Sequence, residues 1–417
     1  MSRSGGSKRY NPNVPETARP EILPWEIARQ KVIDTVRSLA RNFDSETVPL
    51  EAAYGRVLSA AVLSDRDYPS LRRSLRDGFA IHAADAPGTL KVRGEIRAGE
   101  EQSAALNRGE ALEIMTGAPV PDSADAVIMV EHVLRQGDSI VVDRSAEAGQ
   151  FINPRGAEAT RGAVLISAGV KIDASHISTL AMTGTTDVPA VRRPSVAILA
   201  TGDEIVELEA KPDPHQIRNS NSFMLASLVR ASGGSPAVLP VARDTEDALL
   251  PLLKRGLDHD MLLISGGVSA GKYDLVKPSL RKLGVVFHFE RVRVQPGQPT
   301  AFGTLGDKPV FGLPGNPGSS LITYQLFARP ALEILCGQSE PVQPFLLARF
   351  EAPFRHKLGL TRFLPARLAT DGQSLRHIPW QGSSDIPALA RANVFLVADH
   401  DRETWDVGDT IRVMLKP

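Results

Sequence analysis

Residues 195–202 read SVAILATG, a continuous apolar run that ends in a glycine turn. This pattern is typical of a strand buried on both faces, as the strands of parallel sheets are. Two later stretches have the same form, HDMLLISGG at 259–267 and PVFGL at 309–313. Helical patterns at 219–234, 244–257, 273–284 and 319–337 alternate with these runs. The alternation predicts a mainly parallel sheet between two helical layers, a three-layer α/β domain over residues 194–338.

The chain on either side of this domain is richer in strand patterns. Short β-rich runs separated by Gly, Pro and Asp predict a β-rich module over 48–148 and a β domain over 339–417. Inside the α/β region, segments 286–294 and 300–305 predict a hairpin-like pair. Apolar residues at steps of three and four, from Trp25 through Val32 to Phe43, predict an amphipathic helix. Residues 1–23, rich in Gly, Ser, Pro and Arg, are expected to form a disordered tail.

Composition restricts the class of protein. Lys and Arg number 48 and Asp and Glu number 48 among 417 residues, so the formal net charge is zero and nothing draws the whole chain to nucleic acid or to an anionic membrane. No apolar run approaches the roughly 18 residues needed to span a bilayer, and no leader pattern is present. One cysteine, Cys336, fits a reducing compartment. We therefore expect a cytoplasmic globular protein with no nucleic-acid or membrane partner.

Three glycine-bearing loops each follow a predicted strand of the α/β domain, at 201–204, 265–274 and 313–320. Loops at the carboxyl ends of parallel strands meet in one crevice, where ligands bind. Glycines let the backbone approach a ligand, and the N–H groups of a following helix attract anions, so these loops predict a phosphate or oxyanion site. An ordinary turn is the alternative for any one loop.

Three acidic residues, Glu204, Asp244 and Asp274, lie in or beside these loops. Carboxylates next to an anion site repel the anion unless a cation lies between them, and Mg²⁺ is bound by one or two carboxylates together with substrate phosphates. The pattern predicts a magnesium site. The alternative is helix capping or a turn, with Asp244 as a candidate N-cap of the helix that follows it.

Two further motifs lie in the first β module, Asp77-Gly78 and Thr116-Gly117-Ala-Pro119. Taken alone, each could be a simple turn. The histidines form no H-x-x-x-H or Cys/His cluster, which argues against zinc, and no G-x-S-x-G or G-x-x-x-x-G-K-[ST] motif is present.

Read together, these motifs resemble the molybdopterin molybdotransferase family, which includes bacterial molybdenum-insertion enzymes (MoeA) and the gephyrin E domain. The likeness runs from about residue 25 to 415. It rests on these segments: DGFA, MTGAPVPDSADAVIMVE, RRPSVAILATGDEIV, IRNSN, SGGVSAGKYD, PGQPTAFG, VFGLPGNPGSS and QGSSDIPALARAN.

The resemblance implies a multidomain α/β and β protein, elongated and homodimeric, with a β-barrel-like C-terminal domain. It also implies a discontinuous linker domain built from residues 24–47 and 149–193, and an active site between the α/β domain of one subunit and the β module of the other. The implied reaction inserts molybdate into adenylylated molybdopterin and releases AMP in a Mg²⁺-dependent step. The implied partners are an upstream molybdopterin adenylyltransferase and downstream molybdoenzymes or their chaperones.

Matched motif by motif, the resemblance assigns catalytic roles to Asp77, Thr116, Glu204, Asp244 and Asp274, with the last three as the metal ligands. The residues expected to bind substrate are Thr201, Gly202, Ser265, Gly266, Gly267, Ser269, Gly271, Gln295, Gln298, Pro314, Gly315, Asn316, Ser319, Arg362 and Ser383. Helix capping is the alternative role for Ser319 and Ser383.

The chain departs from the family pattern at basic positions. The family's K-P-G-K-P stretch reads Gln295-Pro-Gly-Gln298-Pro, and Asn153 stands where an arginine is usual, with Glu158 in place of an aspartate. A charged donor to an oxyanion is worth roughly twice a neutral one, so these changes should weaken molybdate binding. They motivate a second hypothesis, a paralogue that binds pterin or acts as a scaffold without transferring molybdenum.

Overall fold

The computed structural model describes residues 22–39, 44–99, 105–268, 274–342 and 345–416. Most of the predicted N-terminal tail therefore lies outside the described residues, as do Ser269 and Gly271. Two compact units make up the chain. Unit 1 combines residues 1–47, 55–59 and 189–417, and unit 2 combines 48–54 and 60–188.

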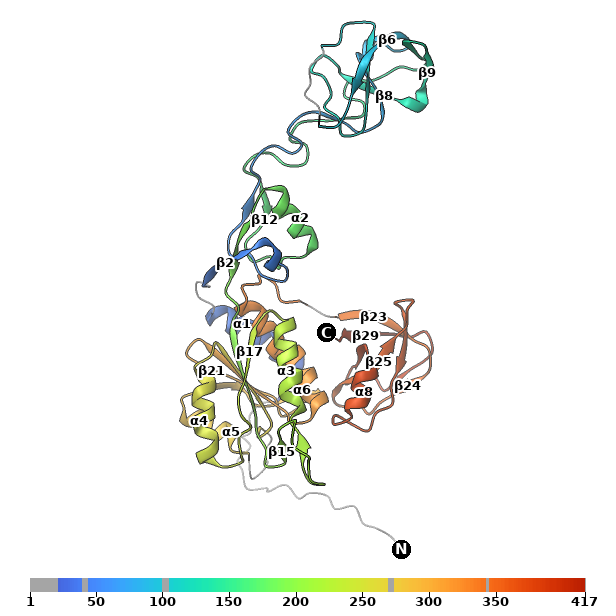
Figure 1. The fold of residues 1–417 in the computed structure, drawn as a ribbon. Coiled ribbons are helices and arrows are strands. Elements are labelled where there is room, and N and C mark those ends of the chain that lie inside the picture. The colour runs from blue at the N-terminus through green and yellow to red at the C-terminus, as the bar shows by residue number, and fades with distance from the viewer. Residues whose placement is uncertain (1–21, 40–43, 100–104, 269–273, 343–344, 417) are drawn as a thin grey trace. The chain divides into compact units, whose positions relative to one another are not determined.

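The α/β domain of unit 1 is built on a six-stranded sheet (Figure 1). The strands, in spatial order, are β17 (Ser235–Val238), β14 (Ser195–Ala200), β18 (Met261–Ser265), β22 (Lys308–Leu313), β21 (Ala301–Leu305) and β19 (Val286–Phe289). The first four are parallel, and β21 and β19 are antiparallel additions at one edge. The prediction of a mainly parallel sheet is confirmed.

Alternate residues of β14 face two separate apolar cores, which gives the domain its three layers. Ile198 belongs to the core shared with α3 (Ser220–Ala231) and α6 (Pro317–Thr323). Leu199 belongs to the core shared with α4 (Glu246–Leu257) and α5 (Val276–Lys282). Figure 1 shows α4 and α5 on one side of the sheet and α3 and α6 on the other.

One predicted pairing is right only in part. The run 286–294 does not form one arm of a hairpin, because it divides into β19 and β20 (Val292–Gln295). Only β19 pairs with β21, whereas β20 pairs in parallel with β1 (Leu23–Pro24) on one side and with β25 (Thr361–Leu368) on the other. Strand β20 therefore carries the chain from the α/β sheet to the sheet of the C-terminal domain.

The C-terminal domain is a closed barrel, as the resemblance implied. Five strands pair around it: β25, β26 (Ser374–His377), β23 (Phe345–Phe350), β29 (Thr410–Leu415) and β27 (Val394–Ala398). Pairing of β27 with β25 closes the ring. The short helix α8 (Ile386–Arg391) and the pair β24 (Phe354–Arg355) and β28 (Thr404–Trp405) complete the domain.

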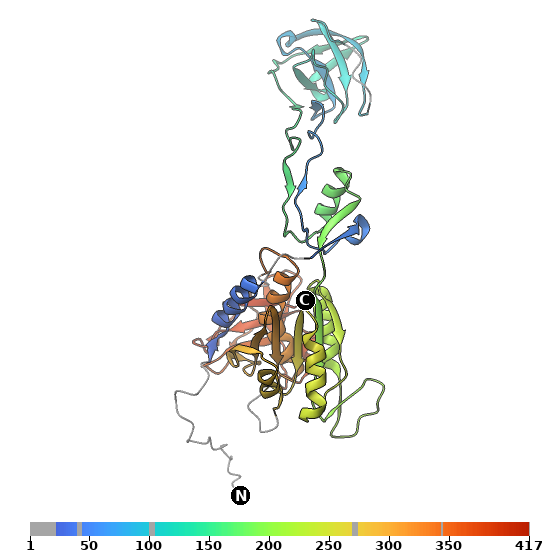
Figure 2. The same cartoon turned by 90° about the vertical axis from the view of Figure 1, so that its left-hand side faces the viewer.

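The N-terminal amphipathic helix is α1 (Trp25–Leu39), whose packing partner the sequence left open. It packs on the last helical segment of the α/β domain, which consists of α6, a π-helical segment η5 (Tyr324–Ala328) and α7 (Arg329–Leu335). Figure 2 shows α1, in blue, beside the orange segment. The structure thus groups α1 with the α/β domain rather than with residues 149–193.

Unit 2 contains the predicted β-rich module. Its six-stranded sheet has the order β8 (Ala126–Met129), β5 (Gly78–Ile81), β7 (Glu110–Ile114), β6 (Gly88–Ile96), β10 (Ser139–Val142) and β9 (Val133–Gln136). Paired short strands, β11 (Ile152–Asn153) with β4 (Arg73–Ser74) and β12 (Val164–Ile166) with β3 (Val62–Leu63), and helix α2 (Ala174–Met182) make up much of the rest. Among the described residues, no helix has the length and apolar character needed to cross a bilayer.

Candidate functional site

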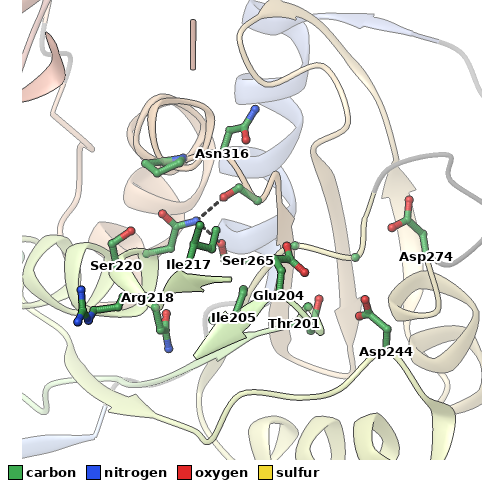
Figure 3. Close-up of a pocket in the computed structure, with 17 residues that line it drawn as sticks. Thr201, Glu204, Ile205, Ile217, Arg218, Ser220, Asp244, Ser265, Asp274 and Asn316 are labelled. Carbon is green, nitrogen blue, oxygen red and sulfur yellow. Dashed lines mark hydrogen bonds between the residues drawn. The ribbon is translucent and has the colours of Figure 1, made fainter. Parts of the chain in front are cut away.

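A pocket of about 290 Å³ opens at the carboxyl ends of β14, β18 and β22. It lies where the sequence predicted that three loops would meet, and Figure 3 shows it from the side. The predicted residues that line it are Thr201, Gly202, Glu204, Asp244, Ser265, Gly266, Gly267, Asp274, Gly315 and Asn316. Loops from three separate strands therefore build a single site.

Glycine is needed at two points of the wall. Gly202 has a φ of +149°, and a Cβ there would lie 2.6 Å from Oε2 of Glu204. Gly266 has a φ of +98°, and its Cβ would lie 2.6 Å from the carbonyl oxygen of Thr201. Any larger residue would displace the Glu204 carboxylate or separate the first two loops.

Asn221, on the first turn of α3, ties the loops together. Its Nδ2 donates to Oγ of Ser265 at 2.9 Å and to the carbonyl oxygen of Gly315 at 2.6 Å. Because a carbonyl oxygen can only accept, this contact fixes which side-chain atom is the nitrogen. Oδ1 of Asn221 and Oγ1 of Thr201 are buried and have no hydrogen-bond partner in the described part of the chain. Within the described part of the chain, the wall thus holds buried polar atoms without a hydrogen-bond partner.

The three carboxylates repel one another across this pocket. Burial raises the pKa of Asp244, and the charges of Asp203, Glu204 and Asp274 raise it further. In Figure 3 the side chains of Glu204, Asp244 and Asp274 lie toward the same end of the pocket. Such a group is destabilised while it is ionised and uncompensated, and a cation would remove the repulsion.

The capping alternative for Asp244 is wrong. Helix α4 begins at Glu246, and its N-cap is Thr245, whose Oγ1 accepts a hydrogen bond from the backbone N–H of Ala248. Asp244 instead receives no cap contact from the helix, and its own backbone N–H donates to Oδ1 of Asp203. The carboxylate of Asp244 is therefore not used to begin α4.

The described lining of the pocket is acidic. Among its described lining residues, Glu204, Asp244 and Asp274 carry three negative charges and Arg218 carries one positive charge, so −3 + 1 leaves −2. Among the described residues, no group of three or more His, Cys, Asp or Glu side chains is arranged so that it could hold a metal ion. The carboxylates share the pocket without forming a closed ligand cluster.

Several predicted binding residues lie outside the pocket wall: Pro314, Gln295, Gln298, Ser319, Arg362 and Ser383. A second group beside the pocket includes Ser319, which lies on α6, and Ser383, which bonds to the residues that begin this helix. Nδ2 of Asn316 donates to Oγ of Ser383 at 2.9 Å, and the N–H of Gly318 donates to the carbonyl oxygen of Ser383 at 2.8 Å. Asn316 thus belongs to both groups.

The strand pair β20 and β25 supplies the rest of this second group. Gln295 and Arg362 are register partners on these strands. A Cβ on Gly297 would lie 2.3 Å from Cγ2 of Thr323, so the turn that holds Gln298 packs directly on α6. Nε of Arg362 is buried and has no hydrogen-bond partner among the described residues. The group therefore offers neutral donors and one unsatisfied guanidinium nitrogen.

Unit 2 holds the two remaining predicted catalytic residues, and they contact each other. Oδ1 of Asp77 accepts from the backbone N–H of Thr116 at 2.6 Å and from its Oγ1 at 2.7 Å. These two bonds, the backbone one first, lower the pKa of Asp77. The next residue must be glycine, because a Cβ on Gly78 would lie 1.9 Å from the carbonyl oxygen of Ile128. The Asp-Gly motif is therefore more than a simple turn.

Asn153 and Glu158, the other departures from the family pattern, lie in unit 2 and bond to each other. Nδ2 of Asn153 donates to Oε1 of Glu158 at 3.1 Å. The two substitutions are thus mutually compatible in the fold.

Sequence reasoning missed part of the pocket wall, which includes Ile205, Ile217, Arg218, Asn219, Ser220, Asn221 and Pro317. Arg218 to Asn221 belong to the IRNSN motif, which contributed to the resemblance but received no role. The signal was present: a polar run immediately before a helix that begins at the sheet's carboxyl edge.

Comparisons with known proteins agree along most of the chain. The family model for the MoeA N-terminal region (domain I and II) matches residues 23–184. A probable molybdopterin binding domain matches 197–334, and the MoeA C-terminal region (domain IV) matches 348–416.

Individual relatives cover nearly the same length. A molybdopterin molybdenumtransferase from Nostoc sp. is 33% identical over 350 residues, 81% of this chain and 80% of that protein. One from Staphylococcus aureus (strain MSSA476) is 28% identical over 403 residues, 94% of this chain and 95% of that protein. The crystal structure of a molybdopterin biosynthesis MoeA protein from Pyrococcus horikoshii OT3 superposes with a TM-score of 0.79 at 27% identity, over 95% of this chain and 100% of that chain. On these grounds, the chain belongs to the MoeA family of molybdopterin molybdenumtransferases.

Proposed function

We propose that this transferase inserts molybdate into adenylylated molybdopterin and releases AMP in a Mg²⁺-dependent step. One observation carries the proposal. Three carboxylates from separate loops, Glu204, Asp244 and Asp274, line one pocket together with glycine turns, and Arg218 is the one basic residue among its described lining. An acidic site that must also accept a phosphoanhydride is best explained by a divalent cation between protein and substrate.

The donor set fits such a cation. Glu204, Asp244 and Asp274 are hard oxygen ligands, and the raised pKa of Asp244 reflects burial together with repulsion that a cation relieves. When bound there, Mg²⁺ would supply positive charge next to the phosphate oxygens on which charge develops.

The chain's own groups orient the phosphates. Gly267 and Gly315 line the pocket wall and α6 begins beside Asn316, whereas the N–H of Gly266 already donates to the carbonyl oxygen of Leu313. Backbone N–H groups at such a helix end favour negative charge. Backbone N–H groups that are not used within the fold can hold the anhydride oxygens, and a cation bound by the carboxylates would neutralise the rest of the charge.

The second group, beside the pocket, is proposed to take molybdate. Ser319, Ser383, Gln295 and Gln298 are neutral donors, and Arg362 contributes one cation whose Nε lacks a partner. A tetrahedral oxyanion fits hydroxyl, amide and guanidinium donors. Its contact with Asn316 would keep the metal oxyanion next to the nucleotide pocket.

The assembly and location extend this proposal. In a homodimer, Asp77 and Thr116 would serve the pocket of the other subunit, with the Asp77 carboxylate held ionised by its two bonds from Thr116. The substrate would come from a molybdopterin adenylyltransferase and the product would pass to molybdoenzymes or their chaperones, in the cytoplasm.

The test is reconstitution with adenylylated molybdopterin, molybdate and Mg²⁺, followed by measurement of AMP and of activity in a molybdenum-dependent apoenzyme. The proposal predicts that both appear and that a chelator removes AMP release. A folded chain that shows no AMP release and no saturable molybdate binding at millimolar concentration in calorimetry would instead support the scaffold hypothesis.

A further inference from the structure

The first turn of α1 contacts the strands that carry the proposed molybdate group. Strand β1, which directly precedes α1, pairs with β20, so that Pro24 lies opposite Arg293, close to Gln295. Trp25 then packs edge-on against Phe363, with ring centroids 5.5 Å apart, and Phe363 follows Arg362 on β25. Trp25 is thus adjacent to both strands that present Gln295 and Arg362.

Packing, rather than hydrogen bonding, holds Trp25 in this place. Its side chain is 3% exposed, and a second ring, Phe345 of β23, lies 5.7 Å from it. Nε1 of Trp25 is buried and has no hydrogen-bond partner among the described residues. The indole therefore acts through its shape, and another flat aromatic ring should replace most of its effect.

Arg412 of the barrel covers this contact from outside. Its guanidinium lies 5.3 Å from the Trp25 ring and 5.6 Å from the Phe345 ring. It also pairs with Glu26 of α1 at 3.7 Å and with Asp399 of the barrel at 3.2 Å. The N-terminal end of α1 is therefore fixed to the barrel.

The rest of α1 is fixed to the α/β domain and to the connection between the two domains. Arg29, which is 5% exposed, donates to the carbonyl oxygen of Leu326 in η5 and to that of Val342 beyond α7. The N–H of Val342 donates to Glu333 of α7 at 2.9 Å. Helix α1 thus bonds at one end to the barrel and along its length to the helix whose N-terminal end borders the pocket.

We propose that Trp25, supported by Arg412, is a positioning residue for molybdate: it sets β20 and β25 so that Gln295 and Arg362 meet Ser319 and Ser383 at the end of α6. This inference rests on the proposed function. The contacts of Trp25 described above are with Phe363, Phe345 and Arg412, none of which lines the nucleotide pocket. Loss of Trp25 should therefore affect the binding of molybdate and of nucleotide differently. Molybdate binding weakens, and nucleotide binding at the carboxylate pocket does not.

The experiment is calorimetric titration of the full chain with molybdate and, separately, with AMP in the presence of Mg²⁺. For Trp25→Ala we expect the molybdate dissociation constant to rise about tenfold, the scale of a lost aromatic contact, and the AMP constant to stay within about twofold. Trp25→Phe should restore molybdate binding. Ile27→Ala, on the same helix but at a side chain that is 56% exposed, is the matched control and should bind both ligands as the unaltered chain does.

Arg412→Met provides a milder variant if Trp25→Ala proves unstable. It removes the cation over the rings while keeping an apolar stem, and it should raise the molybdate constant about threefold. Equal weakening of molybdate and AMP in these variants, or no change in either, would overturn the inference and leave the proposed function standing. Failure of the unaltered chain to bind molybdate would overturn the molybdate group itself and this inference with it, whereas AMP binding would still report on the pocket.

Discussion

The carboxylates of the α/β pocket and the carboxylate of Asp77 in unit 2 are treated in opposite ways by the fold. Asp244 has a raised pKa because burial and three neighbouring acids disfavour its charge. Asp77 has a lowered pKa because Thr116 donates two hydrogen bonds to it. Asp244 is surrounded by other acidic side chains, whereas Asp77 is hydrogen-bonded to Thr116 within its own unit. Similar acidic motifs therefore have opposite electrostatic surroundings in the two units.

The largest effect is expected from removing one carboxylate of the α/β pocket. Asp274→Ala should lower Mg²⁺-dependent AMP release at least about a hundredfold, because the cation loses a ligand where charge develops. The rate is measured with adenylylated molybdopterin and a range of Mg²⁺ concentrations, and circular dichroism verifies folding. Asp401→Ala, an exposed acidic residue of the barrel, is the control and should keep the full rate. Unchanged turnover in Asp274→Ala would remove this residue from the metal site.

Asp77→Ala tests the role of the hydrogen-bonded carboxylate in unit 2. Turnover should fall at least about tenfold, as expected when a positioned carboxylate is lost, but Mg²⁺ binding at the pocket should not change. Calorimetry and AMP release on the same preparation separate the two. Asp122→Ala, in the same unit and with a side chain that is 95% exposed, should alter neither quantity. A parallel loss of Mg²⁺ binding in Asp77→Ala would mean that the two acidic regions form one metal site.

Restoring charge at the glutamines sharpens the comparison between cationic and neutral donors. The double variant Gln295→Lys/Gln298→Lys should bind molybdate roughly tenfold more tightly, because charged donors to an oxyanion are stronger than neutral ones. Titration with molybdate measures the change. Weaker or equal binding would show that these side chains do not reach the anion.

The melting temperature of the cation-free protein tests why the pKa of Asp244 is raised. A carboxyl whose folded pKa is raised destabilises the fold above that pKa, and the effect disappears below the unfolded pKa, near 3.9. Asp244→Asn should therefore raise the melting temperature by roughly 1 °C at pH 7 with chelator present, and the gain should vanish near pH 3. A melting temperature that falls at pH 7 would contradict the repulsion.

The smallest effect concerns Thr116→Val, which removes the Oγ1 bond to Asp77 and keeps the backbone bond. The pKa of Asp77 should rise part of the way toward its ordinary value, because the backbone N–H of Thr116, which lowers this pKa most, still donates to the carboxylate. The stability that this carboxylate contributes is present at neutral pH and is lost as pH falls through its folded pKa, so the variant loses it at a slightly higher pH. Carboxyl chemical shifts in an NMR titration give the value, and no shift between the two proteins would count against the bond.

Much of the α/β domain could be predicted because its signals are local. The run SVAILATG became β14, and the loops after β14, β18 and β22 met as the rule for parallel sheets requires. The residues Glu204, Asp244 and Asp274 therefore line one pocket as expected. The barrel and the unit 2 sheet also followed from short alternating runs and from the resemblance.

The sequence-based predictions were wrong or incomplete mainly where a partner distant in the chain determines the pairing of a strand or the role of a side chain. Periodicity could identify a strand at 292–294 but could not show that it pairs with β1 and β25 instead of β21. Asp244 and Thr245 are both good capping residues, and only the backbone path selects Thr245. Asn221 was missed because its two bonds reach loops 44 and 94 residues away, a separation at which sequence spacing carries no geometric information.

We propose that the carboxylate pocket of the α/β domain binds one divalent cation. Calorimetric titration of the full chain with Mg²⁺ in the presence of AMP, repeated for Asp274→Ala and Asp401→Ala, tests it most directly. We expect one saturable Mg²⁺ site per chain in the unaltered protein and in Asp401→Ala, and no saturable site in Asp274→Ala. No saturable binding in the unaltered chain, or equal binding in all three proteins, would contradict it.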